Sequence, residues 1–147
     1  MAAHNGDIVP IILMKSANST ACPMIHNNTR NTSITQHERF CISTAQLGKG
    51  LMFTRPRGEF CLVLVLRPLQ RIALHMFFVF APIDVIFADE HYQIVDLKPR
   101  FRPFALYTSR KSACYAIELP VGTIAKSKTR IGDVLSFETS VDGAYDM

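Results

Sequence analysis

Three polar side chains stand where the surrounding sequence is apolar, and their types could support acid–base chemistry: His75, Asp84 and Glu118. An imidazole next to a carboxylate forms a pair that titrates near neutral pH. A buried carboxylate costs several kcal/mol unless hydrogen bonds or protonation compensate for its burial. If the chain turns sharply at Pro82, His75 and Asp84 would approach each other. Hydrolytic or acid–base catalysis by the three residues is therefore one hypothesis for the function.

Each of these residues also has a structural interpretation. Asp84 would accept hydrogen bonds from backbone amides at the turn after Pro82 and so fix a strand corner. His75 would be a satisfied core residue within its apolar run. Glu118 is the only acid between residues 98 and 130, a segment that holds eight of the sixteen basic residues, and it would pair with one of them. The sequence leaves both interpretations open for all three residues.

The same three side chains form a legitimate ligand set for a metal ion, since two carboxylates and an imidazole are suitable donors. No ligand spacing characteristic of a metal site accompanies them. The sequence also lacks a phosphate-binding glycine loop, a dinucleotide-binding turn and a nucleophile elbow. We therefore predict no metal and no cofactor, and we assign no catalytic residue.

A basic segment interleaved with aromatic residues runs from Lys98 to Phe104, with the sequence KPRFRPF. The guanidinium groups of Arg100 and Arg102 suit phosphorylated or carboxylated small molecules. Cations alternating with rings also occur on surfaces that bind single-stranded nucleic acid. A solvated loop anchored by packed phenylalanines is the more ordinary interpretation. Nucleic acid, bound through residues 98–111, is therefore only a secondary candidate for the partner.

Composition indicates one globular domain with a substantial core. The chain has 147 residues, of which 48% are hydrophobic and 19% charged, and its net charge is +4. The four cysteines show no CxxC or CxxH pairing, which favours reduced thiols. No secretory signal is apparent, and the longest apolar run is interrupted by His75, Pro82 and Asp84 before it could span a membrane. We expect a soluble cytoplasmic protein without a membrane partner.

The run at residues 72–97 is the expected centre of the fold. It reads as a strand buried on both faces, then an interruption at Ala81-Pro82, then two shorter strands; the three ranges are Ile72–Phe80, Ile83–Phe87 and Tyr92–Leu97. In the second of these, Asp84 and Ile86 face one side, and Ile83, Val85 and Phe87 face the other. Lys98-Pro99 is expected to end the third.

The remaining segments are read in the same way. Further strands are predicted at 60–66, 112–119 and 134–137, an amphipathic helix at 38–47, a loop at 67–71, an irregular basic stretch at 99–111 and a turn of helix or a loop at 123–128.

The chain is expected to divide into three parts. Residues 1–36 form a polar, partly disordered N-terminal segment in which 8–14 could dock as an edge strand. Residues 37–140 form a single β-rich domain, and 141–147 form a frayed tail. We predict an all-β fold, a compact antiparallel β-sandwich or barrel-like domain with one or two short helices.

Several short motifs occur in a fixed order along residues 39–138. They are Gly50-Leu51-Met52-Phe53, His75–Phe80, Pro82–Phe87, Val95-Asp96, Lys98-Pro99, Ala113–Tyr115, Ile117–Thr123 and Gly132-Asp133. Together they resemble domain-of-unknown-function family one-nine-two in its archaeal style. The resemblance implies a compact β-sandwich or barrel-like body with very little helix, and it provides no established activity.

The family's recurrent polar positions match Asp84, Glu118 and Gly132-Asp133 in this sequence. Many bacterial members carry a tryptophan and then Met-Lys-Asn near the position of His75-Met76, so any role of that lysine or asparagine is absent here. Many of them are also exported behind a signal, which is not apparent in this chain.

The leading hypothesis is a non-catalytic module that binds a small molecule or a protein. The predicted ligand-binding residues are Asp84, His75, Glu118, Met52, Arg100 and Arg102. The first alternative is the acid–base enzyme, and the second is a single-strand nucleic-acid binder.

Overall fold

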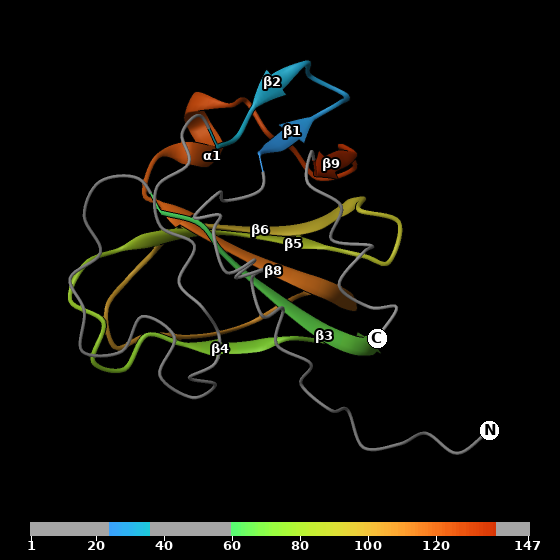
Figure 1. Cartoon of the computed structure of the whole chain (residues 1–147). Coiled ribbons are helices and arrows are strands. Elements are labelled where there is room, and N and C mark those ends of the chain that lie inside the picture. Colours follow the sequence, from blue (N-terminus) through green and yellow to red (C-terminus); the bar gives the residue numbers. More distant parts are fainter. Residues whose placement is uncertain (1–23, 36–59, 138–147) are drawn as a thin grey trace, which may run out of the picture.

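A four-stranded antiparallel sheet lies at the centre of the fold. The computed structural model describes residues 24–35 and 60–137, and the strand order of this sheet is β3-β8-β5-β6 (Figure 1). The four strands in this order are Leu62–Gln70, Ala113–Pro120, Ile83–Ala88 and Ile94–Phe101. The two inner strands, β8 and β5, are the most apolar segments, as expected for strands that are covered on both faces.

A second, smaller sheet covers one face of the central sheet. Its order is β2-β1-β9, from the strands Thr32–Ser33, Ile25–Asn27 and Leu135–Phe137. The short helix α1, Thr123–Lys126, lies on the same side (Figure 1). Apolar side chains of these elements and of the central sheet form one core cluster, which includes Ile25, Ile124, Leu135, Ile86 and Ile117.

A two-stranded ribbon covers the other face. It consists of β4, Ala73–His75, and β7, Leu106–Thr108, which lie on the opposite side of the central sheet from the small sheet (Figure 1). A second core cluster fills the space between ribbon and sheet, with Ile72 and Met76 packed with Ile83, Val85 and Phe87. The layered arrangement confirms the predicted all-β, antiparallel, sandwich-like fold with little helix.

The strand at β5 and the division of its side chains are as predicted. Ile83, Val85 and Phe87 belong to the cluster under the ribbon, and Ile86 belongs to the cluster under the small sheet. The predicted strands at 112–119 and 134–137, and the turn of helix after Gly122, are also present as β8, β9 and α1.

The prediction of a nine-residue strand at Ile72–Phe80 is wrong. Only Ala73–His75 form a strand, and the chain then turns, with Val79 N–H donating to the Met76 carbonyl at 3.2 Å. The run contains Ile72, Met76 and Val79 as inward-facing side chains, while the neighbouring phenylalanines are exposed. The apolar composition of this run therefore predicted a fully buried strand, whereas only part of its side chains are buried.

The prolines at positions 68 and 99 do not end their strands as predicted. β3 continues through Arg67-Pro68 to Gln70, and β6 continues through Lys98-Pro99 to Phe101. Both are outer strands of the four-stranded sheet in the described part of the chain, and an outer strand tolerates a residue without an amide hydrogen.

Part of the expected polar lead-in contributes to the fold. Residues 25–33 supply β1 and β2, and Ile25 is fully buried. The predicted segment 8–14, the predicted helix at 38–47 and the proposed ligand residue Met52 lie outside the described residues. Within the described residues, the structure contains no helix that is long and apolar enough to cross a membrane.

Candidate functional site

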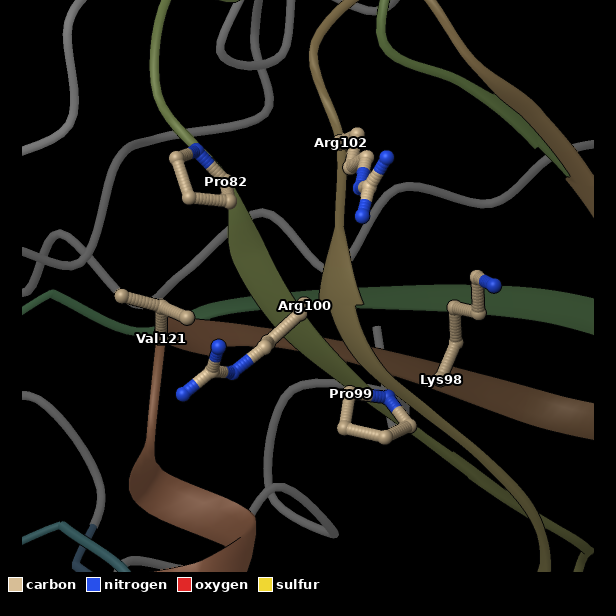
Figure 2. Close-up of a pocket in the computed structure, with 6 residues that line it drawn as sticks. All are labelled: Pro82, Lys98, Pro99, Arg100, Arg102 and Val121. Carbon is tan, nitrogen blue, oxygen red and sulfur yellow. The ribbon is translucent and has the colours of Figure 1, made fainter.

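A groove of about 690 Å³ opens at one end of the central sheet. Three cations and three apolar residues line it: Lys98, Arg100, Arg102, Pro82, Pro99 and Val121. Figure 2 shows the Arg100 side chain extending from β6 toward Val121, which lies just after β8. None of the described residues that line the groove is acidic.

A bulge in β6 produces the shape of this groove. Ile83 pairs with Phe101 and Val85 pairs with Lys98, so β6 has one residue more than β5 between these pairs. Arg100 takes a left-handed backbone conformation there, with φ of 49°. A bulge bends its strand and redirects side chains, and bulges are frequent next to functional sites. The bulge therefore gives this edge of the sheet its cationic wall.

Asp84 lies beneath the groove and connects its two walls. Its Oδ1 accepts the Arg100 amide at 3.0 Å, and its Oδ2 accepts the amides of Gly122 at 3.1 Å and Ile124 at 2.9 Å. The Asp84 residue is 1% exposed. Its hydrogen bonds are with backbone amides, as in the structural interpretation, but the amides come from β6 and α1 and not from the turn after Pro82. With this geometry the carboxylate is a positioning group.

Gly122 has a specific backbone role in this arrangement. It adopts φ of 92°, a conformation that side chains disfavour, and it directs its amide toward Asp84. The residue before it, Val121, forms the wall opposite Arg100 (Figure 2).

His75 is not a core residue, and that expectation is wrong. It lies in β4 opposite Leu106, it is exposed, and its ring stacks on Phe77 with 5.1 Å between centroids. Its Nδ1 accepts the Phe77 amide at 3.3 Å. β4 is in a different sheet from Asp84, whose two carboxylate oxygens are already taken by amides. The structure therefore does not bring these two residues together as an acid–base pair.

Glu118 faces away from Asp84. In β8 it lies directly opposite Leu62 and Val85, whose side chains belong to the cluster under the ribbon, whereas Asp84 alternates with Val85 to the other face. The predicted ion pair to Glu118 is not found among residues 24–35 and 60–137. Desolvation in this apolar setting raises the pKa of Glu118 to about 7. Glu118 is thus a proton-binding group near neutral pH, on the opposite face of the sheet.

The described residues include no group of three His, Cys, Asp or Glu side chains arranged to hold a metal ion. His75, Asp84 and Glu118 accordingly occupy three separate environments. Of the predicted ligand residues within the described part of the chain, only Arg100 and Arg102 line the groove, and Asp84 lies beneath it.

Sequence reasoning did not select Asp96, a fully buried carboxylate in β6. It accepts the Tyr107 hydroxyl at 2.7 Å and both the amide and Nε of Arg110, at 2.8 and 3.2 Å. The ammonium group of Lys98 lies 5.0 Å from the centre of the Tyr107 ring. This network therefore positions one of the groove cations. An acid within an apolar strand, as at Asp84, was the signal that could have identified it.

Asp133 organises a second buried polar network, below the small sheet. Its Oδ2 accepts Nδ2 of Asn27 at 2.8 Å, Nε of Arg30 at 3.2 Å and the Arg130 amide at 2.9 Å. Asn27 is fully buried and also donates to the Thr129 hydroxyl at 3.3 Å. This network fixes the loop before β9 against β1.

Both networks predict a loss of stability in acid. Burial alone would raise the pKa of Asp96 and of Asp133, but hydrogen bonds to the carboxylates outweigh it and hold each pKa below the usual value of 3.8. A lowered folded-state pKa stabilises the fold above the unfolded-state pKa, and this contribution is lost as pH falls through the folded value. Urea midpoints should therefore fall progressively between about pH 5 and pH 2. The variant Asp133→Asn should be less stable than wild type at pH 7, and its urea midpoint should fall less steeply as the pH is lowered. An equally steep fall in the variant would contradict a lowered pKa of Asp133 in the folded state.

Comparison with known proteins identifies relatives over most of the described chain. A family model, DUF192, described as "Uncharacterized ACR", matches residues 26–137. A UPF0127 protein of Thermococcus sibiricus is 37% identical over 117 residues, which is 78% of this chain and 75% of that protein. A UPF0127 protein of Pyrococcus horikoshii is 33% identical over 116 residues, covering 79% of this chain and 100% of that protein.

Two crystal structures share the fold. A protein of unknown function from Novosphingobium aromaticivorans superposes with a TM-score of 0.62 at 17% identity, over 91% of this chain and 94% of that one. A Sinorhizobium meliloti protein, described as a candidate transcription regulator, gives a TM-score of 0.58 at 23% identity, over 63% and 74% of the two chains. At these identities the similarity concerns the fold alone.

Proposed function

The chain belongs to the DUF192 family of uncharacterized proteins. From that premise we propose that it is a non-catalytic module that binds an anionic ligand in the groove at Lys98, Arg100 and Arg102. The ligand class is phosphate or carboxylate compounds. A guanidinium group donates two parallel hydrogen bonds to either group, and an ammonium group adds a point charge.

One observation carries this proposal: three cations line a single groove in which none of the described lining residues is acidic. Basic side chains on a protein surface usually lie near compensating carboxylates. Asp84, beneath this groove, is buried, and both of its carboxylate oxygens accept hydrogen bonds from backbone amides. An anion is the ligand that such an environment attracts.

Preorganisation supports the same proposal. Asp84 holds the Arg100 backbone on one wall and Gly122, next to Val121, on the other, so the groove is formed before any ligand arrives. A preformed site loses less free energy to ordering when it binds.

The acid–base alternative has weaker support. It needs Asp84, His75 and Glu118 in one site, and the three residues have separate positions in this fold. A cytoplasmic location remains part of our proposal, and it is supported by the free and buried thiol of Cys61.

The proposal predicts measurable binding of inorganic pyrophosphate, a compact probe for the phosphate class. We expect isothermal titration calorimetry of the full chain at low salt to give a saturable signal that weakens as salt is raised. Arg100→Gln and Arg102→Gln should each reduce affinity about tenfold, because a hydrogen bond to a charged group contributes about 1.5–3 kcal/mol.

Lys111→Gln is the matched control. Lys111 is exposed and precedes β8, at the end of that strand opposite to Val121, so its removal subtracts one charge without touching the groove. Equal losses for Lys111→Gln and Arg100→Gln would indicate only general electrostatic attraction and would contradict a specific site.

A further inference from the structure

We propose that the natural ligand of the groove is single-stranded nucleic acid, with phosphates at Arg100 and Arg102 and bases stacked on the exposed rings of Phe80 and Phe104. The inference rests on the proposed anion-binding function and narrows the ligand to the phosphates of a nucleic-acid strand. The sequence alone made nucleic acid a secondary candidate, because the phenylalanines of the basic segment were expected to be packed anchors. In the structure Phe104 is 52% exposed, so it is not a packed anchor and its ring is accessible to a ligand.

Two loops join to present these rings. The Met76 amide donates to the Ala105 carbonyl at 2.8 Å, and the Phe104 amide donates to the Met76 carbonyl at 2.7 Å. The rings of Phe80 and Phe104 meet edge to face, with 6.1 Å between centroids and 66° between planes. Phe80 is 46% exposed. These bonds hold the two rings in place while about half of each residue remains open to solvent, which is the condition for stacking a base.

Phe80 and Phe104 are close in sequence to residues that line the cationic groove. Phe80 is two residues from Pro82, and Phe104 is two residues from Arg102, and both Pro82 and Arg102 line the groove. Two residues of chain span at most about 7 Å, which is the scale of one nucleotide. A strand with its phosphates in the groove could therefore place a neighbouring base on either ring.

The charge distribution suits a polyanion. No Asp or Glu occurs between Asp96 and Glu118, and Asp84 is buried beneath the groove. Proteins that bind single strands combine a positive groove with aromatic rings on which unpaired bases stack. A duplex keeps its base faces covered, so it could use the cations but not the rings. An acidic peptide would likewise satisfy the cations and leave the rings unused.

The test is fluorescence anisotropy of the full chain with a labelled ten-nucleotide oligo-dT, at 50 and 200 mM salt. We expect binding that weakens with salt, because phosphate contacts release counterions. Phe104→Ala should weaken oligo-dT binding about tenfold, since stacking of one base contributes substantially to affinity. Phe104→Tyr keeps a ring and should restore binding.

Leu106→Ala is the matched control within the same surface. Leu106 is 69% exposed and apolar but has no ring, so its truncation should leave oligo-dT binding unchanged. Circular dichroism should show the same fold for all variants, because the substituted side chains are exposed.

Separate ligands distinguish failure of this inference from failure of the proposed function. If pyrophosphate binds but oligo-dT does not, or if Phe104→Ala and Leu106→Ala have equal effects, nucleic acid is excluded while the anion groove stands. Tighter binding of a ten-residue glutamate peptide or of a duplex, without dependence on Phe104, would also overturn the inference. Loss of pyrophosphate binding as well would overturn both proposals.

Discussion

Asp84→Asn is expected to lower the free energy of unfolding by about 3 kcal/mol at pH 7. One carboxylate oxygen serves the Arg100 amide and the other serves Gly122 and Ile124. An asparagine side chain has only one acceptor oxygen, so in either orientation its NH₂ group faces a backbone N–H. A buried donor left without an acceptor costs about 1–3 kcal/mol, and the remaining bonds lose their charge assistance. Urea unfolding followed by circular dichroism measures the change.

Glu90→Gln is the control for this substitution. Glu90 is also an acid, but it lies exposed in the turn after β5, with its Oε1 3.5 Å from Nε2 of exposed His91. Its substitution should change stability by less than about 0.5 kcal/mol. A loss below about 1 kcal/mol for Asp84→Asn would mean that the three amides find other acceptors. The folded Asp84→Asn variant should also bind pyrophosphate more weakly than wild type, since both groove walls depend on this carboxylate.

The inner strands of the sheet were predictable because local and global requirements agree there. The six residues of β5 are all buried, three on each face of the sheet, and the apolar side chains among them made both the strand and its burial predictable from the sequence. β8 has the same character, with seven of its eight residues apolar. The position of Asp84 within such a strand was enough to predict a buried carboxylate that needs hydrogen-bond partners.

The identity of those partners could not be predicted from spacing. Gly122 and Ile124 are 38 and 40 positions from Asp84 in sequence, and they reach it only because β8 pairs with β5 and leads into α1. The groove depends on the same pairing. Arg100 and Arg102 were predicted as ligand residues from their charge, whereas Pro82 and Val121 were not, because nothing local marks them as neighbours.

The error at His75 has a different physical cause. The run from Ile72 to Phe80 is almost wholly apolar, and such a run predicts a buried strand. The fold uses three of its side chains, Ile72, Met76 and Val79, for the core. The three phenylalanines of the run are exposed, and one of them, Phe80, carries a ring on which we propose that a base stacks. Hydrophobic composition therefore indicated an important segment without distinguishing a core from a binding surface.

Glu118→Gln is expected to stabilise the protein by about 2 kcal/mol at pH 8 and to have almost no effect at pH 4. Desolvation raises the pKa of Glu118 from 4.5 to about 7 in the folded state. Between these two pH values the folded protein holds a proton that the unfolded chain has released, so stability falls as pH rises through this window. Each unit of difference between the folded-state and unfolded-state pKa of Glu118 corresponds to about 1.4 kcal/mol of stability. Partial solvent access to the Glu118 side chain makes the expected effect smaller than the whole pKa difference would give. Glutamine cannot ionise, so it removes the penalty.

The measurement is urea unfolding of wild type and Glu118→Gln at pH 4, 6 and 8, combined with a carbon-13 NMR titration of the Glu118 carboxyl group. The two stability curves should coincide at pH 4 and separate progressively toward pH 8, with the wild type below. Equal stability at pH 8 together with a carboxyl pKa near 4.5 would mean that Glu118 is solvated on the face of the sheet under the ribbon. Separation of the curves would instead identify Glu118 as a group that takes up or releases a proton near neutral pH, in a position independent of the groove that Asp84 supports.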